Sequence, residues 1–470
     1  MNDHTNDNTN DNTNEDMNED MGAGAGKGRA RARARARART SSEGMSNSTG
    51  KDTGKDAGKD TGEDAGGDIS GGAVARVVQL DVLRGFALLG IVVVNAQMMA
   101  GPYYVFGGGP DASALDRGVA WLITALVASK FYLLFSFLFG YSFVLQERSA
   151  ARAGVPFGPR HLRRTAGLFA LGLAHAVLLY PGDILMAYAV LALALYGARG
   201  LPPRTAVKLA AGLVVFLTAL LLLEGLASVA VTEPLTAAGY APTAADTIAA
   251  HRGDALSVIG AHLTDLPGSI AANLLYSPDL FAAFLAGFAA GRVRLLERRG
   301  RDRAWLRRTA LRWLPLGLLG GIVSALCANW PLDNRWFDVG HAVAVLTGPA
   351  LTASYVCGLL LLLDSARRPA RVLTAALASS GRLALTHYLT QSLVLALVFT
   401  GYGLGLYDRA GAAAVLAGSV LLYGGQLALG ARLTGRFRYG PAELLLRTVT
   451  LARRPGARPD TGPSPAGRPA

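Results

Sequence analysis

The first long apolar segment of the chain reads LDVLRGFALLGIVVVN at positions 80–95. Asp81 and Arg84 stand three residues apart, so on a helix they share one face and can form an ion pair. Asn95 follows about three turns further along, near the opposite membrane surface. Charged and amide side chains are costly in lipid unless they face protein or water, which makes these three residues candidates for substrate binding. The segment predicts a central membrane helix, and snorkelling of Arg84 to the lipid headgroups is the structural alternative.

Composition extends this prediction to most of the chain. Hydrophobic residues make up 51% of the sequence and charged residues 17%, and the mean hydropathy is +0.31. The apolar runs are about 18 to 25 residues long, the length that crosses about 30 Å of hydrocarbon as a helix. They lack the alternation of barrel strands. We therefore expect an all-α, polytopic integral membrane protein whose helix bundle lies in a lipid bilayer.

The order of apolar runs predicts about ten membrane spans. Clusters of arginine follow every second span, whereas the other connections hold only scattered basic residues. By the positive-inside rule, both termini are cytoplasmic. Lys130 falls within the second span and indicates an interfacial piece before the true crossing. The expected ranges are 80–100, 119–145, 162–180, 184–198, 205–231, 269–291, 309–328, 339–363, 380–402 and 412–431.

The two ends of the chain have a different composition from the membrane domain, which we place at 73–452. Residues 1–72 contain Asn-Asp-Asn-Thr repeats, an Arg-Ala alternation and Lys-Asp-Thr-Gly repeats, with almost no apolar surface, and we expect them and residues 453–470 to be disordered. Charge runs of this kind are usually solvated, so we expect no nucleic-acid partner. No secretory signal sequence is recognisable, and Met45 is an alternative start.

Motifs of soluble enzymes are missing from the sequence. It contains no P-loop, nucleophile elbow or dinucleotide fingerprint. His251 and His262, in the largest outer loop, lack ligand spacing, so we expect no metal site. Cys327 and Cys357 fall at opposite depths of neighbouring spans, which rules out a disulfide between them.

Polar residues inside the spans are the remaining candidates. His175 lies near the outer end of the third span, and the turn that follows brings Asp183 back toward it. A carboxylate that orients a histidine is the usual arrangement of a general base. In the ninth span His387, Tyr388 and Gln391 crowd one turn. Hydrogen bonds between helices are the structural alternative for each histidine.

A weak internal repeat is also visible. The motif LRRTA occurs at 162–166 and at 306–310, and FLFG at 137–140 resembles FLAG at 284–287. Both pairs enter the membrane in the same direction, so a parallel repeat of four spans is one hypothesis. Chance matching in a chain rich in leucine, alanine and arginine is the other.

Several of these motifs resemble those of the YeiB family of bacterial inner-membrane proteins. They are the opening segment, FSFLFG at 135–140, GLAH at 172–175, GDIL at 182–185, and SGRLALTHYLTQS at 380–392. The resemblance covers about residues 76–452 and places the family's C-terminal domain of unknown function at about 285–452. It implies a multi-pass protein of the bacterial inner membrane and an association with transport.

The opening helix is also remotely similar to the first helix of membrane acetyltransferases of the heparan-glucosaminide type. That likeness implies transfer of an acetyl group from a cytoplasmic thioester to an acceptor across the membrane. Those enzymes use a histidine in the loop after the first helix, and residues 100–118 contain none. His175 is the candidate that remains.

Two functions follow as hypotheses. As an acyltransferase, the protein binds the phosphates of acyl-coenzyme A at Arg84 and neighbouring arginines, and His175, held by Asp183, deprotonates the acceptor. As a transporter, it uses its polar faces to line a pathway for a small solute. The candidate substrate-binding residues are Asp81, Arg84, Asn95, Lys130, His387, Tyr388 and Gln391. No bound cofactor is expected; the substrate is an unknown small or lipid-linked molecule, and the oligomeric state is open.

Overall fold

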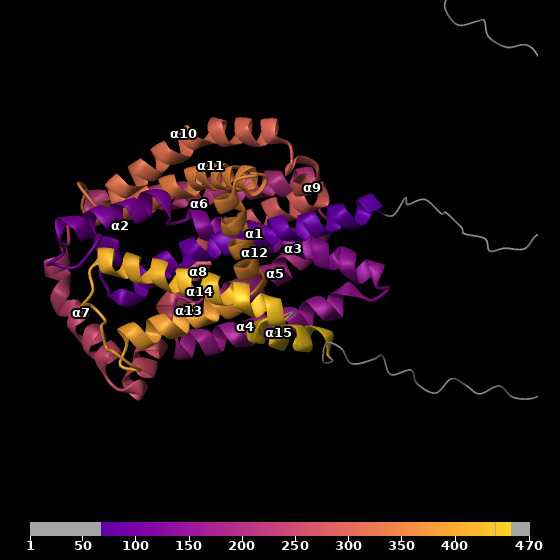
Figure 1. Ribbon diagram of the computed structural model, residues 1–470. Coiled ribbons are helices and arrows are strands. Elements are labelled where there is room, and N and C mark those ends of the chain that lie inside the picture. Colours follow the sequence, from indigo (N-terminus) through magenta and orange to yellow (C-terminus); the bar gives the residue numbers. More distant parts are fainter. Residues whose placement is uncertain (1–66, 438, 453–470) are drawn as a thin grey trace, which may run out of the picture. The chain divides into compact units, whose positions relative to one another are not determined.

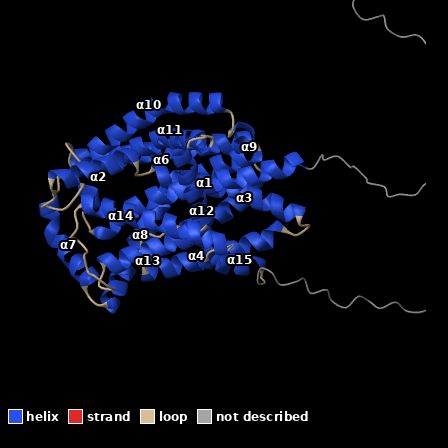
Figure 2. Ribbon diagram, in the orientation of Figure 1, coloured by secondary structure: helices blue, strands red, loops and turns tan. Residues whose placement is uncertain are grey.

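A computed structural model describes residues 67–437 and 439–452, with side chains from Val78 onward. Within these ranges every regular element is a helix (Figure 2). The expected terminal tails lie outside the described residues, except that α1 begins at Gly67. Short 3-10 turns are η1 (Tyr104–Phe106), η2 (Ala198–Gly200) and η3 (Asn334–Trp336). The α-helices are α1 (Gly67–Ala100), α2 (Ala114–Leu126), α3 (Lys130–Arg152), α4 (Phe157–Leu178), α5 (Leu185–Gly197), α6 (Pro203–Val231), α7 (Ala237–Arg252), α8 (Ala255–Arg292), α9 (Leu295–Arg299), α10 (Arg303–Ala328), α11 (Phe337–Leu363), α12 (Arg368–Arg382), α13 (Ala384–Phe399), α14 (Ala412–Arg436) and α15 (Pro441–Leu451).

The helices form the expected polytopic bundle. Among the described residues, seven stretches are long and apolar enough to cross a membrane, or eight if α12 and α13 are one bent span. This is fewer than the ten expected. The third expected span corresponds to α4, whose first half carries three arginines, and the fourth corresponds to α5, which has only 13 residues.

Helix α1 lies in the middle of the bundle (Figure 1) and packs against α3, α12, α13 and α14. Its buried residues Leu83, Leu88 and Val92 belong to the largest hydrophobic cluster of the described chain. Lipid tails are as apolar as the helix surfaces, so the hydrophobic effect does not drive helices together inside a bilayer. Dispersion contacts and the close fit of side chains stabilise such packing instead. The prediction that the first apolar segment is central is confirmed.

The second expected span is interrupted where the sequence indicated. Helix α2 ends at Leu126, Ser129 takes a left-handed conformation with φ 69°, and α3 begins at Lys130. The Nζ atom of Lys130 donates a hydrogen bond to the carbonyl oxygen of Thr124, 2.9 Å away. The lysine therefore satisfies a carbonyl group that the broken helix leaves without an intrahelical partner.

The ninth expected span, 380–402, corresponds mainly to α13, and the sequence did not predict the separate helix α12 that precedes it. Helices α12 and α13 meet at Leu383 and are bent by 85°. Close packing holds α12 across α1, because a Cβ atom on Gly381 would overlap the carbonyl oxygen of Asp81 and one on Gly85 would overlap that of Leu377. Helix α12 therefore runs across the bundle rather than along α13 (Figure 1).

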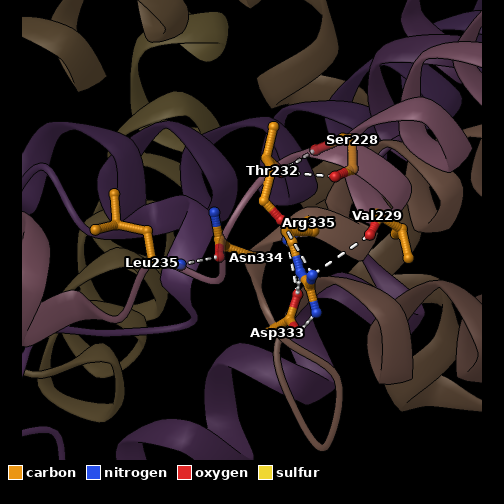
Figure 3. A network of polar contacts seen from close by, with 7 residues as sticks. All are labelled: Ser228, Val229, Thr232, Leu235, Asp333, Asn334 and Arg335. Atoms are coloured by element: carbon orange, nitrogen blue, oxygen red, sulfur yellow. Dashed lines mark hydrogen bonds and ion pairs between the residues drawn. The ribbon is translucent and has the colours of Figure 1, made fainter.

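Polar contacts join the loops at the end of the bundle where α7 lies (Figures 1 and 3). Arg335 pairs with Asp333 at 2.8 Å and donates hydrogen bonds to the carbonyl oxygens of Val229 and Thr232. The side chain of Asn334 accepts a hydrogen bond from the backbone N–H of Leu235. This network, called the outer loop network below, ties the end of α6 to the start of α11.

The two cysteines are buried and free, as the depth argument predicts.

Candidate functional site

The turn between α4 and α5 brings His175 and Asp183 together. The Nδ1 atom of His175 lies 2.9 Å from Oδ1 of Asp183, and both side chains are almost fully buried. The second carboxylate oxygen of Asp183 accepts a hydrogen bond from the backbone N–H of Met186, in the first turn of α5. Glycine is required at position 172, because a Cβ atom there would lie 2.6 Å from that oxygen. The predicted proximity is confirmed.

Tyr388 of α13 completes this group. Its hydroxyl donates to Oδ1 of Asp183 at 3.4 Å, and its ring centroid lies 5.0 Å from that of His175. Neither ring nitrogen of His175 has a hydrogen-bond partner of good geometry among the described residues, so the contact between Nδ1 and Asp183 is a close approach of two charged or polar atoms and not an aligned hydrogen bond. A carboxylate this close to an imidazole stabilises its protonated form, which is one requirement of a general base.

A cavity of about 460 Å³ leads toward this group from the end of the bundle that the charge pattern predicts to be cytoplasmic. Its walls come from α1, α3, α4, α5, α12, α13 and α15. Apolar side chains line most of it, and Tyr388 belongs to its wall. Polar and charged side chains also line the cavity, among them Arg84, Ser142, Gln146, Arg164, Arg382, Glu443 and Arg447.

Arg84 is fixed before any ligand binds. Its guanidinium donates hydrogen bonds to Asp81 at 2.8 Å and to the hydroxyl of Ser142 at 2.7 Å. The expected pairing within α1 is therefore confirmed. The arginine lines the cavity and contacts two protein groups, as expected of a charged residue that faces protein.

The other arginines leave donors available to a ligand. The Nε atom of Arg164 is buried and has no hydrogen-bond partner among the described residues, while its guanidinium lies 6.0 Å from the ring of Phe139. Arg382 is exposed at the break between α12 and α13, and Arg447 stacks on Tyr439 at 4.9 Å. Four guanidinium groups around one cavity are suited to phosphate or carboxylate groups.

Glu443 is the acidic residue of this cavity wall, and it is already engaged. One carboxylate oxygen accepts hydrogen bonds from the backbone N–H groups of Leu385 and Thr386, at 2.7 and 3.0 Å. These groups form the N-terminus of α13, where a negative charge is stabilised. The carboxylate is therefore stabilised by α13 and forms no ion pair with the arginines of the cavity among the described residues.

The remaining predicted residues lie elsewhere. His387 and Gln391 face α14: Gln391 donates to Gln426 at 2.8 Å, and Gln426 donates to the backbone oxygen of His387 at 3.1 Å. The Nδ1 atom of His387 lies 2.9 Å from the hydroxyl of Ser380. These contacts form a buried connection between helices, called the α13–α14 clamp below.

Asn95 and Lys130 are not part of the arginine-lined cavity. Asn95 is half-buried on α1, and Lys130 is held by the carbonyl of Thr124. Sequence reasoning had not assigned Arg164, Arg382, Arg447 or Glu443 to the site individually. Their signal was present, because Arg164 belongs to the LRRTA motif and Arg382 to the segment that resembles the YeiB family.

A second cavity, of about 290 Å³, opens among the loops at the other end of the bundle. Asp111, Asp116, Asn329 and Asp408 are among the residues that line it. Burial raises the pKa of Asp408 from its ordinary value of 3.8, and the charge of Arg252 opposes that rise. Among the described residues, no group of His, Cys, Asp and Glu could hold a metal ion.

Comparison with known proteins finds relatives along most of the chain. Residues 290–453 match a family model described as a protein of unknown function, DUF418. The uncharacterized protein YxaH of Bacillus subtilis (strain 168) is 28% identical over 392 residues, covering 80% of this chain and 94% of the relative. The uncharacterized 39.9 kDa protein in the amylase 3' region of Bacillus acidopullulyticus is 28% identical over 400 residues, covering 81% and 95%. The uncharacterized protein YeiB of Escherichia coli (strain K12) is 27% identical over 389 residues, covering 80% and 96%.

Proposed function

The chain belongs to a YeiB-like family of multi-pass membrane proteins, and from this premise we propose that it is an acyltransferase of the bacterial inner membrane. In this proposal it takes an acyl group from a cytoplasmic thioester and delivers it to an acceptor that enters from the outer face. One observation carries the proposal: the arginine-lined cavity extends from the basic end of the bundle to Tyr388, which contacts the Asp183–His175 pair.

The depth of the site matches a particular kind of donor. Arg164 and His175 lie on the same helix, 11 residues apart, which corresponds to about 16 Å at helical rise. A ligand bound by its phosphates at the arginines reaches the histidine only if a long, slender arm separates its charge from its reactive group. Acyl-coenzyme A is built in this way, because a long, flexible arm separates its phosphates from its thioester.

Each group then has a defined role in the transfer. The Nε2 atom of His175 accepts the proton of the acceptor hydroxyl or amine, and the freed lone pair attacks the thioester carbonyl carbon. The carbon–sulfur bond breaks, and the thiolate leaves with the proton that His175 returns. Asp183 keeps the imidazole oriented and stabilises its positive charge, while the arginines bind the phosphates.

Purified protein with labelled acetyl-coenzyme A and a panel of hydroxyl and amine acceptors tests the proposal. We expect free coenzyme A and labelled product from the wild type, none from His175→Ala, and reduced transfer from Asp183→Asn. His161→Ala is the matched control, because His161 is a buried histidine of the same helix that contacts the backbone oxygen of Ala192 instead. Absence of product with every acceptor contradicts the proposal, and transfer by His175→Ala contradicts the assigned base.

A transporter of a small solute is the second candidate function. The break between α12 and α13 favours it, since transporters often build substrate sites from discontinuous helices. Proteoliposomes distinguish the two candidates: a transporter moves solute without consuming thioester, and an acyltransferase consumes thioester without net flux of solute.

A further inference from the structure

The repeat in the sequence is longer than two short motifs. After FLFG and LRRTA, a third segment recurs in the same order: DILMAYAVL at 183–191 matches DVGHAVAVL at 338–346 at five of nine positions. The first copies fall on α3, α4 and the start of α5. The second copies fall on α8, α10 and α11, in the same order.

The contacts between α3 and α8 show how the two copies meet. The hydroxyl of Tyr132 donates to Asp279 at 2.7 Å, and these residues are 147 positions apart. A Cβ atom on Gly291 would lie 3.1 Å from the Cβ atom of Val144, again 147 positions away. Residues that occupy the same place in both copies therefore touch each other.

Two further contacts are reciprocal. A Cβ atom on Gly140 would overlap the carbonyl oxygen of Phe284, and one on Gly287 would overlap the carbonyl oxygen of Phe137. Adding the same 147 positions to the residue number leads from Gly140 to Gly287 and from Phe137 to Phe284. Contacts in which residue i touches j and j touches i define an isologous interface, the kind that a two-fold axis generates.

Part of the packing of the neighbouring helices follows the same relation. Helix α1 packs against α3 as α6 packs against α8, and α5 packs against α8 as α11 packs against α3. The packing of α6 on α11 and of α2 on α10 has no equally extensive counterpart in the other copy. Along the chain, a shorter helix separates the first two long helices of each copy: α2 stands between α1 and α3, and α7 stands between α6 and α8.

We infer that α1–α5 and α6–α11 are two copies of one unit, related by a two-fold axis that passes between α3 and α8. The interaction surface of each copy is the face of α3 or α8 that carries the FLFG or FLAG motif, and its partner is the other copy. The matched helices cross in the same direction, so the axis runs along the membrane normal.

The duplication assigns the site to one copy. In the second copy Asp338 matches Asp183, whereas the LRRTA alignment places Leu319 where the first copy has His175. Under the proposed function, on which this step rests, Asp338→Asn therefore leaves transfer unchanged. The two-fold relation itself does not depend on that function.

An exchange of side chains across the axis tests the relation in the full chain. The ring centroids of Phe139 and Phe284 lie 4.8 Å apart, and the two rings are stacked. The equivalent positions in the other copy are Ala286 and Phe137. Phe139→Ala should lower the melting temperature of the purified protein by several degrees. Adding Ala286→Phe should restore at least half of that loss, because the new ring can stack on Phe137. The matched control, Ala283→Phe in the same background, should restore none. Recovery no greater than in the control contradicts the two-fold axis.

A second measurement needs no added bulk at position 286. Gly140→Ala and Gly287→Ala meet the same obstacle, a carbonyl oxygen of the partner helix, and should lower the melting temperature equally. Gly212→Ala, where no atom lies within 4 Å, should leave it unchanged. A loss confined to one of the two interface glycines contradicts the relation. Neither measurement uses activity, so its outcome is independent of the acyltransferase proposal.

Discussion

At the scale of single residues, the site is organised before a ligand arrives. Arg84 is held by Asp81 and Ser142, so its guanidinium needs little reorganisation to meet an anion. Under the proposed function, a donor phosphate bound there would form the same contact in the ground state and in the transition state. Such uniform binding lowers KM and leaves kcat unchanged.

Arg84→Ala and Arg164→Ala should therefore each raise the KM for the acyl donor, by about tenfold if one charge-assisted hydrogen bond is lost. Steady-state kinetics with varied donor concentration measure the change. Arg163→Ala is the matched control, because Arg163 is the exposed neighbour of Arg164 on α4 and does not line the cavity. A fall in kcat with an unchanged KM would show that these arginines act on the reaction itself.

Tyr388→Phe should lower kcat severalfold while the protein stays folded, since it removes the hydroxyl that donates to Asp183 and leaves the ring in place. The comparison variant is Tyr402→Phe, because the Tyr402 hydroxyl is buried and has no partner among the described residues. Equal effects of the two variants on transfer would argue against a role for Tyr388 in positioning Asp183.

At the scale of elements, polar contacts hold helices together where apolar packing gives little preference over lipid. Gln426 of α14 contacts both Gln391 and the backbone of His387 on α13. The clamp lies one turn beyond the break at Leu383, so it fixes the short helix that also presents Tyr388. The residues expected to bind substrate in this span thus support one that lines the cavity.

Gln426→Leu should reduce the free energy of unfolding by about 1 kcal/mol, the usual size of a hydrogen bond between membrane helices. Unfolding of the purified protein in mixed detergent micelles measures this. Leu421→Ala, on the exposed surface of the same helix, should have no comparable effect. A neutral Gln426→Leu would mean that packing alone holds α13 to α14.

The outer loop network gives a pH dependence. Hydrogen bonds from Arg335 hold the pKa of Asp333 below its ordinary value of 3.8. A carboxylate with a lowered pKa stabilises the folded state above its unfolded pKa, and the stabilisation is lost as the pH falls through the folded value. Asp333→Asn should therefore lose less stability than the wild type between pH 6 and pH 3. Parallel pH profiles would instead show that other groups account for the acid sensitivity.

The sequence predicted the pair His175 and Asp183 because a tight turn places them close in space. It could not predict the complete cavity, since Arg84, Arg164, Arg382 and Arg447 come from four helices that only tertiary packing brings together. Arginines near helix ends also occur for the positive-inside rule, so the sequence alone does not distinguish arginines that bind a ligand from those that set the topology. The break at Leu383 was missed because that position holds neither proline nor glycine, and the glycines that permit the crossing lie before it and on α1.

At the scale of the whole molecule, helicity and the central place of α1 follow from hydropathy, whereas the number of spans does not. Length and composition decide clearly for long helices such as α6 and α8. They do not decide whether α4 and α5 cross the membrane, because the first half of α4 carries three arginines and α5 has only 13 residues. The orientation of the bundle depends on the arginine clusters and stays a prediction.

Reporter fusions test that orientation. A reporter inserted after Arg299, at the end of α9, should be read as cytoplasmic, and one inserted after Asp254, before α8, should be read as external. The two sites flank one long helix, so each serves as the control for the other. The reverse readings would invert the topology and place the arginine-lined cavity on the outer side.

The position of α15 has a practical consequence for anyone who handles this protein. Leu446, Thr450 and Leu451 belong to the cavity wall, so the last turns of α15, the last helix of the described residues, form part of that wall. A purification tag fused directly after Leu451, or a truncation before it, would alter the wall itself and could be mistaken for an inactive preparation. Affinity tags are therefore better placed ahead of α1, and shortened versions of the chain should keep α15 to its end.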